Sequence, residues 1–134
     1  ARHHVRQERP LRAIFDKRLV LAPGELVLSF CVPLEAPEWP WSHYRRTRTG
    51  EVDYPLVTVA LVHDGAGIRF AVSGAHPYPF RSDAVDALLS KDGAAALPAV
   101  LEALGPLRAD ARASLEYRVA LLKNMIRAGL EDLA

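Results

Sequence analysis

The hydrophobic and polar positions of this chain follow two different periods, and the change falls near residue 82. Before it, short apolar runs rich in β-branched residues are bounded by proline and glycine, which is typical of strands. After it, apolar residues recur three or four positions apart, which predicts helices. Strands followed by helices, without alternation between the two, indicate an α+β fold in which an antiparallel sheet carries helices on one face.

The first part of the chain predicts a sheet of three to four strands. The run that begins at Leu56 ends in the turn Asp64-Gly65-Ala66-Gly67, and the next run returns as its antiparallel hairpin partner. The segment 34–42, which holds two prolines and two tryptophans, is expected to be loop. We expect extended structure at residues 25–32, 42–49, 56–63 and 68–73.

Three helices are predicted in the last part of the chain. Ser82 is the expected N-cap of the first, which ends at Asp92-Gly93. The second covers residues 94–104, where Pro98 is tolerated only in the first turn. The longest begins after Ser114, and we expect Arg118 on its polar side. Its apolar stripe comprises Leu115, Val119, Leu122, Ile126, Leu130 and Leu133.

Composition narrows the classes of function. Seventeen basic and sixteen acidic side chains nearly cancel, so no overall field attracts nucleic acid or an anionic membrane. No apolar run approaches the about 20 residues that a membrane span needs. A lone cysteine, Cys31, cannot form an internal disulfide or a multi-cysteine metal site, and it fits a reducing compartment. We therefore expect a cytoplasmic protein in which Cys31 is a small buried apolar residue.

The residues themselves predict no catalytic site and no metal site. Nucleotide-binding glycine loops and the nucleophile motif Gly-x-Ser-x-Gly are missing from the sequence. His43, His63 and His76 lack cysteine or carboxylate neighbours at metal-ligand spacing, and the pair His3-His4 is expected to be a flexible start.

One local concentration of charge, Arg45, Arg46 and Arg48, falls on a predicted strand. Strand alternation places Arg45 on one face and Arg46 with Arg48 on the other. Guanidinium groups bind phosphate well, but they bind surface carboxylates equally well. The residues alone leave both interpretations open.

Several motifs, taken in order, resemble a known family. They are the stretch 19–27 with Val32-Pro33, Asp53-Tyr54-Pro55-Leu56-Val57, the segment Ser73 to Arg81, and the segment Asp110 to Arg118. This order resembles the C-terminal domain of the FAD-binding subunit of molybdenum hydroxylases, the xanthine dehydrogenase and carbon monoxide dehydrogenase flavoprotein family. The turn His76-Pro77-Tyr78-Pro79-Phe80-Arg81 departs from the family pattern at its first residue, where alanine is usual.

The resemblance implies a domain organisation, cofactors and partners. Residues 1–33 would end the preceding FAD-binding subdomain and residues 34–134 would form the C-terminal α+β domain. The intact subunit would pass electrons from iron-sulfur clusters through FAD to an acceptor such as NAD, and the isolated domain would be inactive. Its partners would be the N-terminal FAD-binding part of the same subunit and the subunits that carry molybdopterin and 2Fe-2S clusters. Arg45 or Arg46 matches the basic residue that approaches the flavin in that family.

An alternative from a different class is a free-standing α+β interaction module without a cofactor. This alternative predicts a native chain that begins near Ala1, whereas the subunit interpretation predicts a few hundred preceding residues. Self-association of the isolated piece is expected if its surfaces expose apolar patches.

Overall fold

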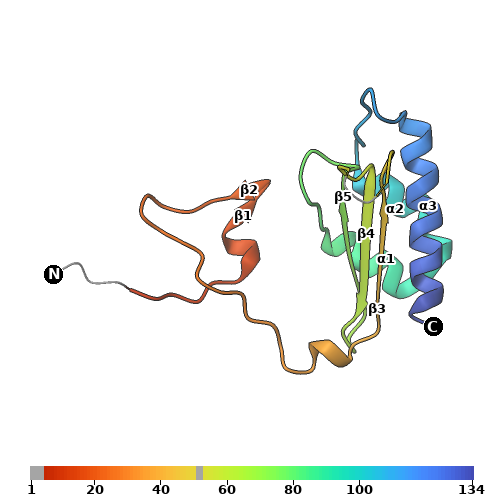
Figure 1. Ribbon diagram of the computed structural model, residues 1–134. Helices are drawn as coiled ribbons and strands as arrows, with labels where there is room; N and C mark the ends of the chain where they lie inside the picture. Colours follow the sequence, from red (N-terminus) through yellow and green to blue (C-terminus); the bar gives the residue numbers. More distant parts are fainter. Residues whose placement is uncertain (1–4, 51–52) are drawn as a thin grey trace. The chain divides into compact units, whose positions relative to one another are not determined.

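The computed structural model describes residues 5–50 and 53–134, and His3 and His4 lie outside the described residues (Figure 1). The chain divides into two compact units, Ala1–Val32 and Pro33–Ala134. Each unit is described by itself.

The second unit holds an antiparallel sheet in the order β3-β4-β5. Its strands are β3 (Trp41–Arg46), β4 (Val57–His63) and β5 (Ile68–Ser73), and a 3₁₀ turn, η2 (Ala36–Glu38), precedes them. The register places Tyr44 opposite Val59 and Val59 opposite Val72. Three of the four predicted strands are therefore present, and the predicted antiparallel sheet is confirmed.

The helices follow the sheet in the predicted order, α1 (Asp83–Asp92), α2 (Leu97–Leu104) and α3 (Leu115–Asp132), with a 3₁₀ turn, η3 (Gly93–Ala96), before α2. Pro98 lies in the first turn of α2, where its missing amide hydrogen costs no helical bond. The Ser114 hydroxyl caps α3 by accepting a hydrogen bond of 3.2 Å from the amide of Tyr117. The α+β fold is thus confirmed.

The core lies between one face of the sheet and the helices. Alternate residues of β4 are buried, since successive side chains of a strand point to opposite faces. Helix α3 packs against β3 and β4, and α1 packs against β5 (Figure 1). Gly129 lets α3 approach closely, because a Cβ there would come within 2.4 Å of Leu61. The fully or almost fully buried apolar residues include Val57, Val59, Leu61, Phe70, Val72, Val85, Val100, Leu122 and Ile126.

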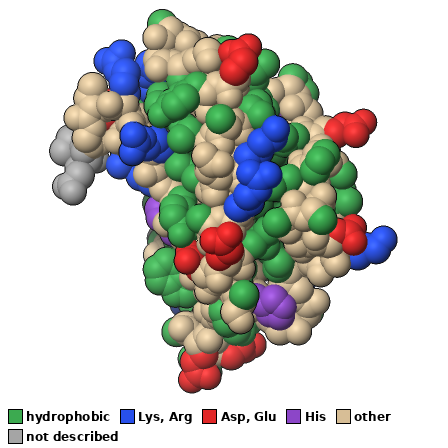
Figure 2. Space-filling view, turned by 90° about the vertical axis from the view of Figure 1, so that its right-hand side faces the viewer, with side chains coloured by type: hydrophobic (Ala, Val, Ile, Leu, Met, Phe, Trp, Pro, Cys, Tyr) green, Lys and Arg blue, Asp and Glu red, His purple; other side chains and the backbone are tan. Residues whose placement is uncertain are grey.

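Helix α3 differs from the prediction at Arg118. The side chain of Arg118 is completely buried, whereas we expected it on the polar side of the helix. Leu115, counted in the apolar stripe, is instead exposed. The physical reason is that backbone carbonyls of two distant loops surround Arg118 and bind its guanidinium group. Figure 2 shows the α3 side of the molecule, where acidic, basic and hydrophobic side chains lie interspersed.

The first unit is built from short elements: the 3₁₀ turn η1 (Leu11–Ala13) and the strands β1 (Phe15–Asp16) and β2 (Arg18–Leu19). The strand predicted at residues 25–32 is wrong, because these residues form no ladder with any described segment. Cys31 is exposed and not buried as expected, since the segment that carries it has no packed face. No described helix is both long enough and apolar enough to span a membrane.

Candidate functional site

The motif segments that are far apart in the sequence meet around the side chain of Arg118. One guanidinium nitrogen, Nη1, donates to the carbonyl oxygens of Leu56 and Gly74, the second at 2.9 Å. The other, Nη2, donates to Asp110 Oδ1 at 2.7 Å. The Arg118 side chain therefore binds three segments at once: the loop before β4, the loop after β5 and the turn before α3.

Asp110 is the acidic centre of this arrangement. Its Oδ1 accepts from Arg118 and from the amide of Arg112, the latter at 2.9 Å. Its Oδ2 lies 3.2 Å from Arg112 Nη2 and 3.4 Å from Arg108 Nε. Partial burial by itself would raise the pKa of the Asp110 carboxyl. The amide and guanidinium of Arg112, with the guanidinium of Arg118, outweigh it and hold that pKa well below its ordinary value. Asp110 is thus ionised wherever the protein is folded near neutral pH.

Gly74 is required where the two loops cross. It has a φ of +77°, in the left-handed region that other residues rarely adopt. A Cβ at this position would come within 2.7 Å of the carbonyl oxygen of Leu56. The loops therefore approach each other more closely than any side chain at residue 74 allows.

A cavity of about 190 Å³ opens beside this junction. It is lined by Tyr54, Pro55, Ser73, Gly74, His76, Pro77, Tyr78, Pro79, Arg108 and Arg112. All three motif segments contribute to this wall, and apart from Ser73 at the end of β5 the wall residues lie in loops. The arrangement places aromatic, basic and backbone polar groups around one small, open hollow.

His76 forms a buried part of the cavity wall. Its ring stacks on Phe80 with a centroid separation of 4.5 Å and an interplanar angle of 13°. Its Nε2 atom has no hydrogen-bond partner among the described residues. Burial lowers the pKa of His76 because it disfavours the charged imidazolium. His76 thus contributes a neutral aromatic ring to the wall, and the charge of the site comes from arginine.

The structure separates the two arginines that were predicted as cofactor-binding candidates. Both are exposed at the end of β3, but they lie on opposite faces of the strand. Arg46 pairs with Val57, whose side chain points into the core. Arg45 pairs with Thr58, which in turn pairs with Ser73, a residue of the cavity wall.

Arg45 also makes a hydrogen bond to a residue that precedes the cavity wall in the sequence. Its Nη2 donates to the backbone carbonyl of Asp53, the residue before Tyr54. Tyr54 itself lines the cavity and is 78% exposed. The backbone carbonyl of Arg46 accepts a hydrogen bond from the amide of Leu56, which follows the wall residue Pro55, and neither arginine is itself among the residues that line the cavity.

Arg81, the last residue of the His76 to Arg81 motif, has a structural contact. Its Nη2 lies 2.5 Å from Asp86 Oδ2, and Asp86 Oδ1 accepts 2.8 Å from the amide of Phe70. This ties the end of the motif to α1 and to β5. Arg81 is therefore held away from the cavity by a buried carboxylate.

Sequence reasoning missed Arg108 and Asp110 and misjudged Arg118. The alternation Arg108, Asp110, Arg112 followed by the helix start at Ser114 is the signal that could have found them. Alternating opposite charges just before a helix cap favour a compact turn closed by ion pairs. Among the described residues no group of three or more histidine, cysteine or carboxylate side chains is arranged to hold a metal ion.

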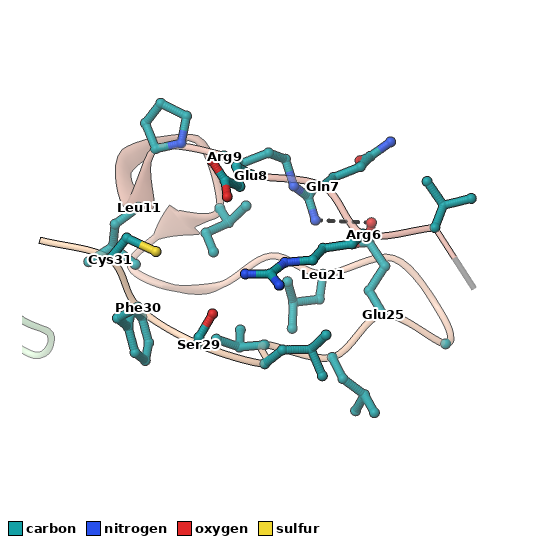
Figure 3. Close-up of a pocket in the computed structure, with 17 residues that line it drawn as sticks. Arg6, Gln7, Glu8, Arg9, Leu11, Leu21, Glu25, Ser29, Phe30 and Cys31 are labelled. Carbon is teal, nitrogen blue, oxygen red and sulfur yellow. Dashed lines mark hydrogen bonds and ion pairs between the residues drawn. The ribbon is translucent and has the colours of Figure 1, made fainter.

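The first unit has a cavity of its own. A space of about 740 Å³ lies between the segment 5–14 and the segment 21–31 (Figure 3). Arg9 Nη2 and Glu25 Oε1 close one side with an ion pair of 3.0 Å. The remaining wall mixes apolar and polar side chains, among them Leu21, Ser29 and Phe30. This space is a gap between two loosely packed segments.

Comparisons with known proteins find similarity at the level of structure. No protein-family model and no curated protein matches the chain. A chain of carbon monoxide dehydrogenase from Hydrogenophaga pseudoflava, in a form that lacks the Mo-pyranopterin moiety of the molybdenum cofactor, aligns with a TM-score of 0.61 and 25% identity. The alignment covers 76% of the present chain and 39% of that chain.

Two further solved structures are similar. Quinoline 2-oxidoreductase from Pseudomonas putida 86 aligns with a TM-score of 0.56 and 19% identity over 72% of this chain and 37% of that one. Reconstituted CO dehydrogenase from Oligotropha carboxidovorans aligns with a TM-score of 0.54 and 19% identity, covering 71% and 36%. At these identities the likeness is one of fold. The present chain spans less than two fifths of each neighbour, and all of these neighbours are oxidoreductases.

Proposed function

We propose that this chain is part of the FAD-binding subunit of a molybdenum-hydroxylase-type, xanthine dehydrogenase-like oxidoreductase. The observation that carries the proposal is the convergence of the Asp53, Ser73 and Asp110 motif segments on one cavity. Similarity in fold to carbon monoxide dehydrogenase and quinoline oxidoreductase chains supports the same assignment. In this account the intact subunit accepts electrons from iron-sulfur clusters and passes them through FAD to an acceptor such as NAD.

Residues 34–134 would form the C-terminal domain of that subunit, and residues 1–33 the end of the preceding FAD-binding subdomain. Support comes from the alternation of exposed apolar residues at Leu26, Leu28, Phe30 and Val32. Such alternation is typical of a strand with one covered face, yet these residues are unpaired among the described ones. A neighbouring part of the subunit would supply both the pairing strand and the cover.

Arg45 is the residue that we propose approaches the flavin. It lies on the face of the sheet that carries Thr58 and Ser73, and its Nη2 donates to the backbone carbonyl of Asp53, the residue before Tyr54. When bound, FAD would supply the two-electron redox chemistry, and the Arg45 guanidinium would favour negative charge that develops on the reduced ring. Arg46, on the opposite face, would contribute less. The remaining partners would be the molybdopterin and 2Fe-2S subunits in the cytoplasm.

A matched pair of substitutions tests the assignment. The complete polypeptide that contains this chain would be expressed with Arg45→Ala or with Arg46→Ala, and its flavin content measured by visible absorption together with its redox potential. We expect Arg45→Ala to lower flavin retention or shift the potential, and Arg46→Ala to change both less. Flavin content and potential that are unchanged in both variants would overturn the role of these arginines.

The competing function is a free-standing interaction module without a cofactor. It is favoured by the exposed apolar side chains of Leu26, Leu28 and Phe30, which could equally be covered by a separate protein. A native polypeptide of about this length that contains no flavin would favour this second function.

A further inference from the structure

We propose that the cavity between Tyr54, Arg108 and Arg112 binds a phosphate group. The proposal concerns the residues of the second unit alone and does not depend on the assignment to a flavoprotein. It rests on three observations. Positive charge exceeds negative charge at the turn around Asp110, some arginine N–H donors remain unused after the internal contacts are made, and both Arg108 and Arg112 line the cavity.

The excess charge is visible in the ion pairs of Asp110. Three guanidinium groups, from Arg108, Arg112 and Arg118, lie within 3.4 Å of its two carboxylate oxygens. Asp53 is a second carboxylate in the neighbourhood: it accepts hydrogen bonds from the hydroxyl of Thr49 and the amide of Tyr54, and the positive charges of Arg48 and Arg112 also act on it, so two carboxylates face four arginines. Holding like charges together costs free energy, and an anion of two negative charges relieves that cost.

The arrangement of donors leaves one side of each arginine available. Arg112 contacts Asp110 through Nη2, and Arg108 contacts Asp110 through Nε. The two terminal nitrogens of Arg108 therefore make no contact with the described residues. Both guanidinium groups approach the same oxygen, Asp110 Oδ2, so they must lie close to each other. Arg118 is buried, and its two terminal nitrogens are taken up by Asp110 and the two loop carbonyls, while its Nε has no partner among the described residues. Asp110 therefore orients Arg108 and Arg112 and leaves their outer donors for a ligand.

The cavity gives these donors a shaped surface. Arg108 and Arg112 both line it, and their side chains are 45% and 30% exposed, so an anion from solution can reach them. Its volume of about 190 Å³ accommodates a tetrahedral oxyanion with room for part of an attached group. The exposed ring of Tyr54 stands at the same wall, where an attached group would meet it.

The chemistry favours phosphate over a carboxylate or chloride. A pair of guanidinium groups matches the oxygens of a phosphate with parallel N–H···O bonds, and phosphate carries more than one negative charge at neutral pH. The phosphate can be free or attached to a nucleotide, since both present the same oxygens. Comparison of the two sources is part of the test.

The probe is inorganic phosphate added to the full 134-residue chain, with ADP as the second ligand. Binding is followed by isothermal titration calorimetry, with sodium chloride adjusted to keep the ionic strength constant. Arg108→Gln is the informative variant because this side chain is exposed and makes one long ion pair among the described residues. Arg127→Gln, an exposed arginine on α3, is the matched control for loss of one charge.

We expect saturable binding that is retained in Arg127→Gln and weakened about tenfold or more in Arg108→Gln. Tighter binding of ADP than of phosphate would show that the group is nucleotide-borne, and equal binding would indicate free phosphate. A circular dichroism spectrum that is unchanged in Arg108→Gln excludes unfolding as the cause. The inference is overturned if phosphate does not bind to the wild-type chain, or if both variants lose affinity equally.

Discussion

Arg118 Nη2 donates a hydrogen bond of 2.7 Å to Asp110 Oδ1 from a position that is completely buried. The same guanidinium binds the carbonyls of Leu56 and Gly74, which are 62 and 44 residues away in the sequence. A buried charge is tolerated when it is paired and hydrogen-bonded; both terminal nitrogens of Arg118 meet this condition, and its Nε has no partner among the described residues. The site therefore depends on this one side chain to keep three loops together.

Removal of the Arg118 side chain should be strongly destabilising. Arg118→Leu leaves the buried oxygens of Leu56 and Gly74 and the Asp110 carboxylate without their donor. We expect the free energy of unfolding, measured by urea denaturation, to fall by about 3–5 kcal/mol. Arg127→Leu, on the exposed side of the same helix, should change it by less than about 0.5 kcal/mol. Equal effects of the two variants would contradict the proposed role of Arg118.

Asp110 should make the protein sensitive to acid. Its pKa is lower in the folded protein than its ordinary value of 3.8, so the unfolded chain binds the proton more readily. The contribution of the Asp110 carboxylate to the free energy of unfolding is present above about pH 4. It is lost as the pH falls further toward the pKa of Asp110 in the folded protein. Asp110→Asn should therefore be less stable than the wild type at pH 7, and the difference should shrink at low pH. Urea titrations between pH 7 and pH 2 check this, and a difference that stays constant with pH would count against it.

His76 should add a second pH dependence in a different range. Burial lowers the pKa of His76 below its ordinary value of 6.5, so protonation is easier in the unfolded chain. The contribution of the neutral His76 ring to the free energy of unfolding is fully present above about pH 6.5 and decreases as the pH falls below that value. His76→Phe keeps the aromatic contact with Phe80 and should flatten the thermal stability between pH 7 and pH 5. A profile that matches the wild type in this range would refute the assignment.

Gly74 and Gly65 provide a matched test of the loop crossing. Both have left-handed φ values, +77° and +83°, but only Gly74 would bring a Cβ against the backbone of Leu56. Gly65→Ala should lower the free energy of unfolding by about 1–2 kcal/mol, because it introduces backbone strain alone. Gly74→Ala should cost at least about 1 kcal/mol more, because its loop must move away from Leu56 and from Arg118. Equal losses in chemical denaturation would mean that the crossing is not tight.

Much of the fold could be predicted because its signals are local. The β-branched run of β4 and the turn Asp64-Gly65-Ala66-Gly67 each specify their element without distant partners. Ser82 precedes α1 as predicted, but its side chain makes no capping hydrogen bond. The segment 25–32 shows the limit of such reasoning. Its alternation satisfies the strand pattern, but a strand also needs a neighbour, and none of the described segments pairs with it.

The candidate site was harder to predict than the fold. A helical pattern counts Arg118 as polar and assigns it to solvent, while its burial depends on carbonyl groups from two distant loops. Strand alternation correctly separated Arg45 from Arg46, but only the sheet register shows that Arg45 shares a row across the sheet with Thr58 and Ser73. Burial of a charge is a tertiary property that no local window contains.

The most direct test of the proposed function is the native polypeptide itself. It would be isolated from its source cells, and its intact mass, its visible absorption spectrum and the subunits that travel with it recorded. We predict a chain about twice this length or more that is yellow with flavin and accompanied by larger subunits. A colourless chain of this length, without partners that carry molybdopterin or iron-sulfur clusters, would contradict the account.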